Sequence, residues 1–64
     1  MLINGIKGDE WLGVSVMAYL EANHIPKDRV VVEVDGVIVP SVLHNVTFLK
    51  LDQRVEIIQF VGGG

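Results

Sequence analysis

The chain contains no cysteine, which excludes disulfide bonds and thiolate metal sites from its architecture. Only two histidines are present, His24 and His44, and they are too far apart in sequence to match a metal-ligand spacing. With no partner residue nearby, both histidines are expected at the surface rather than in catalysis. The fold must therefore depend on packing and hydrogen bonds alone.

Long apolar runs are also missing. Hydrophobic residues make up 50% of the chain, but they occur in short runs of valine and isoleucine broken by turn residues. None approaches the roughly 20 apolar residues that cross a bilayer. The N-terminus lacks the basic, apolar and small-residue order of a secretory signal. These features predict a cytoplasmic protein that is not embedded in a membrane.

Basic residues are few and scattered. The formal net charge is −3, and the five lysine and arginine residues form no cluster that could neutralise a run of phosphates. Nucleic acid is therefore an improbable partner. The acidic balance either favours encounter with a basic protein surface or serves solubility alone.

What is present is enough for one small domain of 64 residues. Asn4-Gly5 and Asp35-Gly36 are typical two-residue hairpin turns, because both positions of such a turn require positive φ. The first predicts a strand over 1–4 with a short, irregular return within 6–13. The second predicts a hairpin of strands 29–34 and 37–39, ended by Pro40 because proline donates no ladder hydrogen bond.

One helix is predicted over 16–23. Ser15 is a good N-cap, and Val16, Tyr19 and Leu20 follow at the spacing of an apolar stripe. Asn23 or His24 is expected to take the left-handed position at the helix end, before Pro26. Upstream of the helix, Trp11 and Leu12 are expected to cover the core; a contact patch is the alternative.

The remaining segments complete a sheet. A connecting turn over 41–45, a brief edge strand over 46–49 and a turn over 50–53 precede the longest strand, 54–61. With the first and last strands side by side and parallel, the order predicts an α+β fold of the ubiquitin-like β-grasp type. A mixed four- to five-stranded sheet would carry one helix across one face, with residues 1–61 as the domain and 62–64 as a flexible glycine tail.

No enzymatic constellation is visible within the predicted domain. The eight carboxylates are spread along the chain and are interpreted as a solvated surface. Gly5, Gly8 and Gly13 lack the spacing and the lysine of a phosphate-binding loop. An enzyme acting alone is therefore not supported.

The glycine tail is the remaining chemical feature. Gly62, Gly63 and Gly64 are either a frayed end or a thread that fits a narrow channel. Because glycine has no Cβ, three such residues can reach up to about 10 Å through a passage closed to other residues. The sequence ends at Gly64, which is expected to present a free carboxylate.

The chain resembles the ThiS family, the sulfur carrier proteins of thiamine (thiazole) biosynthesis. The resemblance covers nearly the whole chain and is strongest in Arg54-Val-Glu-Ile-Ile-Gln-Phe-Val-Gly-Gly-Gly64. Other matching segments are Asn4-Gly5, Ser15-Val16 with Tyr19-Leu20, and Ile38-Val39-Pro40. Asn23, where the family usually has an apolar residue, and Leu51-Asp52-Gln53 depart from the family pattern.

The resemblance implies a protein that carries sulfur on its own C-terminus and is not itself an enzyme. An E1-like adenylyltransferase of the ThiF type would use ATP and magnesium to adenylate Gly64, and a persulfide would supply the sulfur of a thiocarboxylate. A thiazole synthase of the ThiG type would accept that sulfur. Gly62 and Gly63 would thread the partners' sites, and the chain itself, a monomer when free, would bind no cofactor or metal.

The family docks through the sheet face near the tail, which implies a docking role for Ile58, Phe60 and Val61. Because side chains alternate along a strand, Val55 and Ile57 are expected to face inward and Ile58 and Phe60 outward. In the alternative, local irregularity buries both sets.

Three other functions remain open at this point. The small subunit of molybdopterin synthase is a β-grasp relative that also ends in Gly-Gly, although its members tend to be longer. A sulfur carrier for tRNA thiolation or a ubiquitin-like modifier would use the same terminus. A non-catalytic interaction domain with an incidental glycine tail is the alternative of another class.

Overall fold

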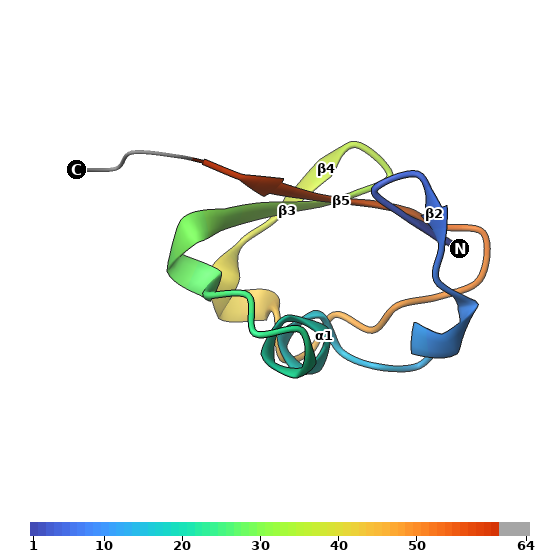
Figure 1. The fold of residues 1–64 in the computed structure, drawn as a ribbon, viewed down its shortest axis with the longest axis horizontal. Helices are drawn as coiled ribbons and strands as arrows, with labels where there is room; N and C mark the ends of the chain where they lie inside the picture. The colour runs from blue at the N-terminus through green and yellow to red at the C-terminus, as the bar shows by residue number, and fades with distance from the viewer. Residues whose placement is uncertain (61–64) are drawn as a thin grey trace.

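The computed structural model describes residues 1–60 and places them in two layers, a sheet and a helix (Figure 1). The strands are β1 (Leu2–Ile3), β2 (Ile6–Lys7), β3 (Val30–Val34), β4 (Val37–Val39) and β5 (Arg54–Gln59). The helix is α1 (Val16–Ala22), and three 3₁₀ turns lie in the connections between these elements: η1 (Asp9–Trp11) before α1, η2 (Lys27–Arg29) before β3 and η3 (Ser41–Leu43) after β4.

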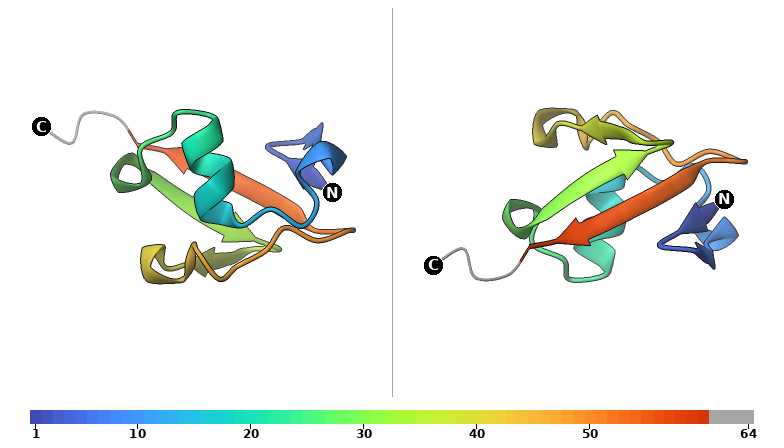
Figure 2. Two further views of the ribbon diagram at one scale, coloured as in Figure 1. Left: turned by 90° about the horizontal axis from the view of Figure 1, so that it is seen from below. Right: turned by 90° about the horizontal axis from the view of Figure 1, so that it is seen from above.

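The sheet has the order β2-β1-β5-β3-β4, with β1 parallel to β5 and the other pairs antiparallel. This arrangement confirms the predicted mixed sheet, with the last strand at its centre. The helix crosses one face of β3 and β5, whereas no helix of residues 1–60 covers the opposite face (Figure 2). Within these residues the sheet therefore has one covered face and one bare face.

Turn chemistry explains both hairpins. Asn4 and Gly5 have φ of 51° and 79°, and Asp35 and Gly36 have φ of 51° and 82°. Two successive positive φ values define the turn that matches the twist of a two-residue hairpin. Both predicted hairpins are confirmed, although β1 and β2 contain only two residues each.

The helix begins and ends as its sequence predicts, within one residue. The Ser15 hydroxyl accepts a hydrogen bond from the Ala18 amide at 3.0 Å, which satisfies one of the free donors of the first turn. At the other end Asn23 is the cap, and His24 takes the left-handed conformation with φ of 57°.

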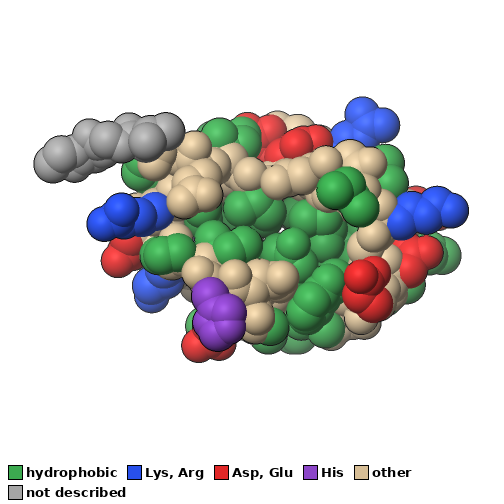
Figure 3. Space-filling model, in the orientation of Figure 1, with side chains coloured by type: hydrophobic (Ala, Val, Ile, Leu, Met, Phe, Trp, Pro, Cys, Tyr) green, Lys and Arg blue, Asp and Glu red, His purple; other side chains and the backbone are tan. Residues whose placement is uncertain are grey.

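The core lies between α1 and the covered sheet face. Its buried members come from both layers and from the loop before β5: Ile3, Val16, Leu20, Val30, Val32, Leu49 and Val55. Trp11 packs against this cluster and meets Tyr19 edge to face, with ring centroids 5.0 Å apart, whereas Leu12 remains exposed. On the side of the molecule that Figure 3 shows, apolar side chains gather in the middle and charged side chains lie around them.

The predicted edge strand over 46–49 is wrong. This segment instead runs beside the entry to the helix, where Thr47 O accepts from Val16 N at 2.8 Å and Leu49 N donates to Val14 O at 2.9 Å. The cause is the unsatisfied amides of a helix start, which need acceptors from outside the helix. Only Ser15 and Phe48 form a β-bridge within this part of the described chain.

The expected surface position of His44 is also wrong, because its side chain is 3% exposed. The chain after η3 folds under the sheet, where His44 O accepts from Met17 N at 3.0 Å. The ring nitrogen Nε2 donates to the Val39 carbonyl at 3.1 Å. This histidine is therefore a structural link between β4 and α1.

Candidate functional site

β5 occupies the centre of the sheet and is held on both sides. It pairs with β3 over five residues and with β1 through Leu2 and Ile3. Beyond Ile3 the Asn4 side chain continues the β1 edge: its Oδ1 accepts from Ile57 N at 2.7 Å, and its Nδ2 donates to Ile57 O at 3.3 Å. The strand that leads to the C-terminus is therefore fixed in position and direction.

The two faces of β5 differ as the alternation of its side chains predicts. Val55 is 1% exposed, and Ile57 packs against the core. On the bare face, Ile58 is 46% exposed and Phe60 is 50% exposed. The expected inward and outward sets are thus observed, while the docking role of Ile58 and Phe60 stays a prediction. Val61 lies outside the described residues.

Ile58 has an apolar neighbour on the same face. It lies opposite Val31 of β3, and side chains directly opposite on one sheet face are in contact range. Phe60 is the next residue of β5's continuation that points to this face. Its amide donates to Arg29 O at 3.2 Å, so the hydrogen bonding between this segment and the chain before β3 extends beyond β5. This apolar group therefore lies at the end of the bare face from which the chain continues to residue 61.

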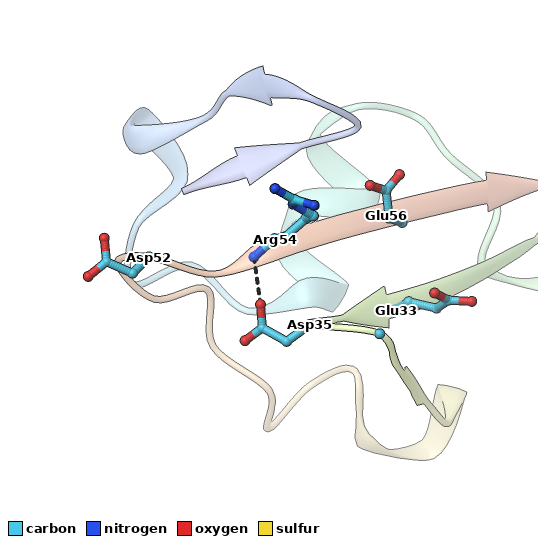
Figure 4. Close-up of a pocket in the computed structure, with 6 residues that line it drawn as sticks. Glu33, Asp35, Asp52, Arg54 and Glu56 are labelled. Atoms are coloured by element: carbon cyan, nitrogen blue, oxygen red, sulfur yellow. Dashed lines mark hydrogen bonds between the residues drawn. The ribbon is translucent and has the colours of Figure 1, made fainter.

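The other end of the bare face is acidic (Figure 4). A depression there is lined by Gly36 and by five charged side chains. Four are carboxylates, Glu33, Asp35, Asp52 and Glu56, and one is the guanidinium of Arg54. Asp35 is used structurally, since its Oδ1 accepts from Arg54 N at 2.9 Å. Glu33 and Glu56 are directly opposite each other on β3 and β5.

Sequence reasoning missed this gathering because it treated the carboxylates as dispersed. The signal was present in the pairing of β3 with β5, which sets residue 33 against residue 56. Within residues 1–60, no group of three histidine or acidic side chains is placed to hold a metal ion. The depression is a charged surface formed by side chains of β3, β5 and the turns next to them.

The predicted reactive residue Gly64 and the threading residues Gly62 and Gly63 lie outside the described residues. The last described residue before them is Phe60, which lies at the apolar end of the bare face and is half exposed.

In the part of the chain that is described, no helix is long and apolar enough to cross a membrane.

The sheet order with β5 at its centre and the single helix across one face place this molecule in the ubiquitin-like β-grasp class. Within that class the chain belongs to the ThiS family, whose family model matches residues 6–64. The match includes the three terminal glycines. It confirms the resemblance noted in the sequence.

A solved structure supports the same assignment. The thiamine biosynthesis protein (ThiS) from Geobacter metallireducens is 27% identical, with a TM-score of 0.76. The similarity covers 98% of this chain and 96% of that chain. A search of curated proteins gave no match.

Proposed function

We propose that this chain is a sulfur carrier of thiamine biosynthesis and that Gly64 carries the sulfur as a thiocarboxylate. The observation that supports the proposal most is the family match, which extends through Gly62, Gly63 and Gly64. The central position of β5 supports it further, because the strand that precedes those glycines in sequence is paired on both sides. The chain is a co-substrate of other enzymes in this proposal.

The chemistry requires activation, because a carboxylate is a poor electrophile. An E1-like adenylyltransferase of the ThiF type would join the Gly64 carboxylate to the α-phosphate of ATP·Mg and release pyrophosphate. The terminal sulfur of a persulfide would then attack the carbonyl and displace AMP. A thiol would cleave the resulting acyl disulfide, which leaves the thiocarboxylate on Gly64. A thiazole synthase of the ThiG type would take up that sulfur.

The chain's own residues have two tasks in this sequence. The glycines pass through a narrow channel because they carry no Cβ. The bare face near Ile58 and Phe60 offers apolar area for docking, since both side chains are about half exposed in the described structure. Burial of such area contributes roughly 25 cal/mol per Å² before the costs of association.

Intact-protein mass spectrometry tests the proposal. The purified chain is incubated with an E1-like adenylyltransferase, ATP, magnesium and a persulfide source. We expect a mass increase equal to the exchange of one oxygen for sulfur, located at Gly64 by fragmentation.

Two matched variants are the controls, one lacking Gly64 and one with a residue appended after it. Both should remain unmodified, because the reacting carboxylate is moved relative to the channel. An unmodified wild-type chain beside a competent partner enzyme would refute the proposal and favour a non-catalytic interaction domain.

A further inference from the structure

One side of the molecule carries no charged side chain. Residues 37–49 form the longest stretch of the chain without an acidic or basic residue, so the five basic and eight acidic side chains all lie elsewhere. This stretch comprises β4, η3 and most of the loop before β5, and it runs along one side of the molecule, opposite β1 and β2 (Figure 2). The β4 side therefore differs from the rest of the surface.

The same side holds most of the strongly exposed aliphatic surface. Among residues 1–60, six valine, leucine or isoleucine side chains are more than half exposed, and five of them lie within residues 37–51: Val37, Ile38, Val42, Val46 and Leu51. At about two-thirds exposure, these five present roughly 400 Å² of apolar surface, about half of what one partner buries in a standard interface. Such an area suits a weak association.

β4 is also an open edge of the sheet. Asp35 N donates to Arg54 O at 2.8 Å, which makes these residues a bonded pair next to the β3–β5 ladder. Bonded and unbonded pairs alternate, so the Glu33 backbone also bonds β5 and does not bond its β4 neighbour Ile38. The Ile38 amide and carbonyl therefore point out from the edge. The opposite edge strand, β2, carries Lys7, a charge of the kind that protects an edge, whereas β4 carries none.

We propose that two copies of this chain associate through β4, antiparallel and related by a two-fold axis at Ile38. Ile38 exchanges both backbone hydrogen bonds with Ile38 of the second copy, and Val37 lies opposite Val39 of that copy. Pro40 has no amide and limits the pairing to these three residues. The inference goes beyond the proposed function and does not depend on it.

The surroundings of β4 are complementary under the same two-fold axis. η3, with Val42, follows one end of β4. The turn that contains Leu51 lies at the other end, because Asp52 of that turn and Gly36 of the hairpin line the same depression. Antiparallel pairing sets opposite ends together, so Val42 of each copy meets Leu51 of the other.

Charge limits how two copies can meet. Each copy has a formal charge of −3, so two copies repel each other least where the contact surface is uncharged. The acidic depression lies at the hairpin end of β4, and antiparallel pairing places the two depressions at opposite ends of the interface. Because β3 separates β4 from β5, the interface leaves Ile58 and Phe60 uncovered.

Sedimentation equilibrium of the full chain tests the proposal, from about 5 µM to about 1 mM protein at about 0.15 M salt. We expect a dimer with a Kd on the order of 100 µM, as befits a small interface, and a monomer at low micromolar concentration. Ile38→Lys sets like charges opposite each other and should raise Kd at least about tenfold. Ile6→Lys is the matched control, an exposed isoleucine of the other edge strand, and should leave Kd within about a factor of two.

A charge exchange tests the two-fold arrangement. Val42→Lys and Leu51→Glu should each weaken the dimer about tenfold when measured alone. An equimolar mixture should recover it, because one contact then joins the introduced lysine to the introduced glutamate and the other keeps valine against leucine. Urea unfolding of each variant shows whether it is folded, and the mixture provides a test even where Ile38→Lys is not.

A wild-type chain that stays monomeric at about 1 mM would overturn the inference. A dimer that Ile6→Lys weakens as much as Ile38→Lys would overturn it as well, because the contact would not depend on β4. A mixture of the Val42 and Leu51 variants that associates no more tightly than either alone would contradict the antiparallel arrangement. None of these measurements uses the adenylating enzyme, so their outcome is separate from that of the proposed function.

Discussion

A single side chain, that of Asn4, joins the turn of the first hairpin to the central strand. Its left-handed backbone, with φ of 51°, is a conformation that asparagine tolerates better than most residues. Its amide group makes the two hydrogen bonds to the Ile57 backbone described above. One residue thus acts as an additional rung between β1 and β5, close to the apolar end of the bare face.

Asn4→Ala should lower the free energy of unfolding by about 2 kcal/mol, because it removes two exposed hydrogen bonds and places alanine at positive φ. Urea unfolding at neutral pH measures the change. Asn4→Gly is the matched control, since it loses the same bonds without the backbone penalty, and it should cost about 1 kcal/mol. Wild-type stability in Asn4→Gly would mean that the side-chain bridge contributes nothing.

Asp9 provides the clearest pH-dependent group in the described structure. The Met1 ammonium donates a hydrogen bond to its Oδ1 at 2.7 Å, and this bond, with the charge of the same ammonium, lowers the pKa of Asp9. Lys7 lowers this pKa further, whereas desolvation opposes the shift. The bond holds the N-terminal end of β1 against η1.

Because the folded pKa of Asp9 is lowered, its contribution to stability is complete above the usual aspartate pKa of about 3.9 and is lost as the pH falls through the lower folded value. NMR titration of the Asp9 carboxyl carbon should show a midpoint below that usual value. Acetylation of the Met1 amine removes the charge and should return the midpoint toward it. An unchanged midpoint after acetylation would assign the shift to another cause.

At the scale of elements, the sequence predicted what local chemistry decides and missed what long-range contacts decide. Asn4-Gly5, Asp35-Gly36 and Ser15 each specify a turn or a cap within a few residues, and all three are observed. His44 gives no local sign of burial, because it is packed beside α1, which lies far from it in sequence and whose Met17 N donates to His44 O at 3.0 Å.

The same distinction applies to the candidate site. Alternation along β5 predicted the inward and outward sets without knowledge of the fold. The acidic depression could not be predicted in this way, because Glu33 and Glu56 meet only through the register of β3 with β5, and Asp52 reaches it from the preceding turn. Register depends on the whole sheet, so residue spacing along one strand does not determine it.

β5 itself offers a test with two adjacent isoleucines. Ile57→Ala should lower the free energy of unfolding by about 2 kcal/mol, because it removes apolar contacts with the core. Ile58→Ala, on the bare face, should cost less than about 1 kcal/mol and weaken binding to the adenylating enzyme. Chemical denaturation and a binding titration measure the two effects separately. An Ile58→Ala variant that loses stability but keeps its affinity would refute the predicted docking role of Ile58.

At the scale of the whole molecule, one sheet face forms the core and the other carries the surface proposed for docking. The face under α1 supplies the sheet's buried residues, and the bare face supplies the exposed apolar and acidic groups near β5. A small domain has little stability to spare. Substitutions intended to change partner choice are therefore best placed on the bare face, where they leave the core contacts intact.

The thiamine pathway assignment makes the final prediction. Deleting the gene for this chain should abolish growth without thiamine and leave molybdoenzyme activity intact, because the family match is to ThiS. A copy encoding the full chain should restore growth. A copy lacking Gly64 should not, although the core residues of the described structure are unchanged, because the proposed sulfur-bearing carboxylate is displaced. Normal growth without thiamine combined with loss of molybdoenzyme activity would instead identify the small subunit of molybdopterin synthase.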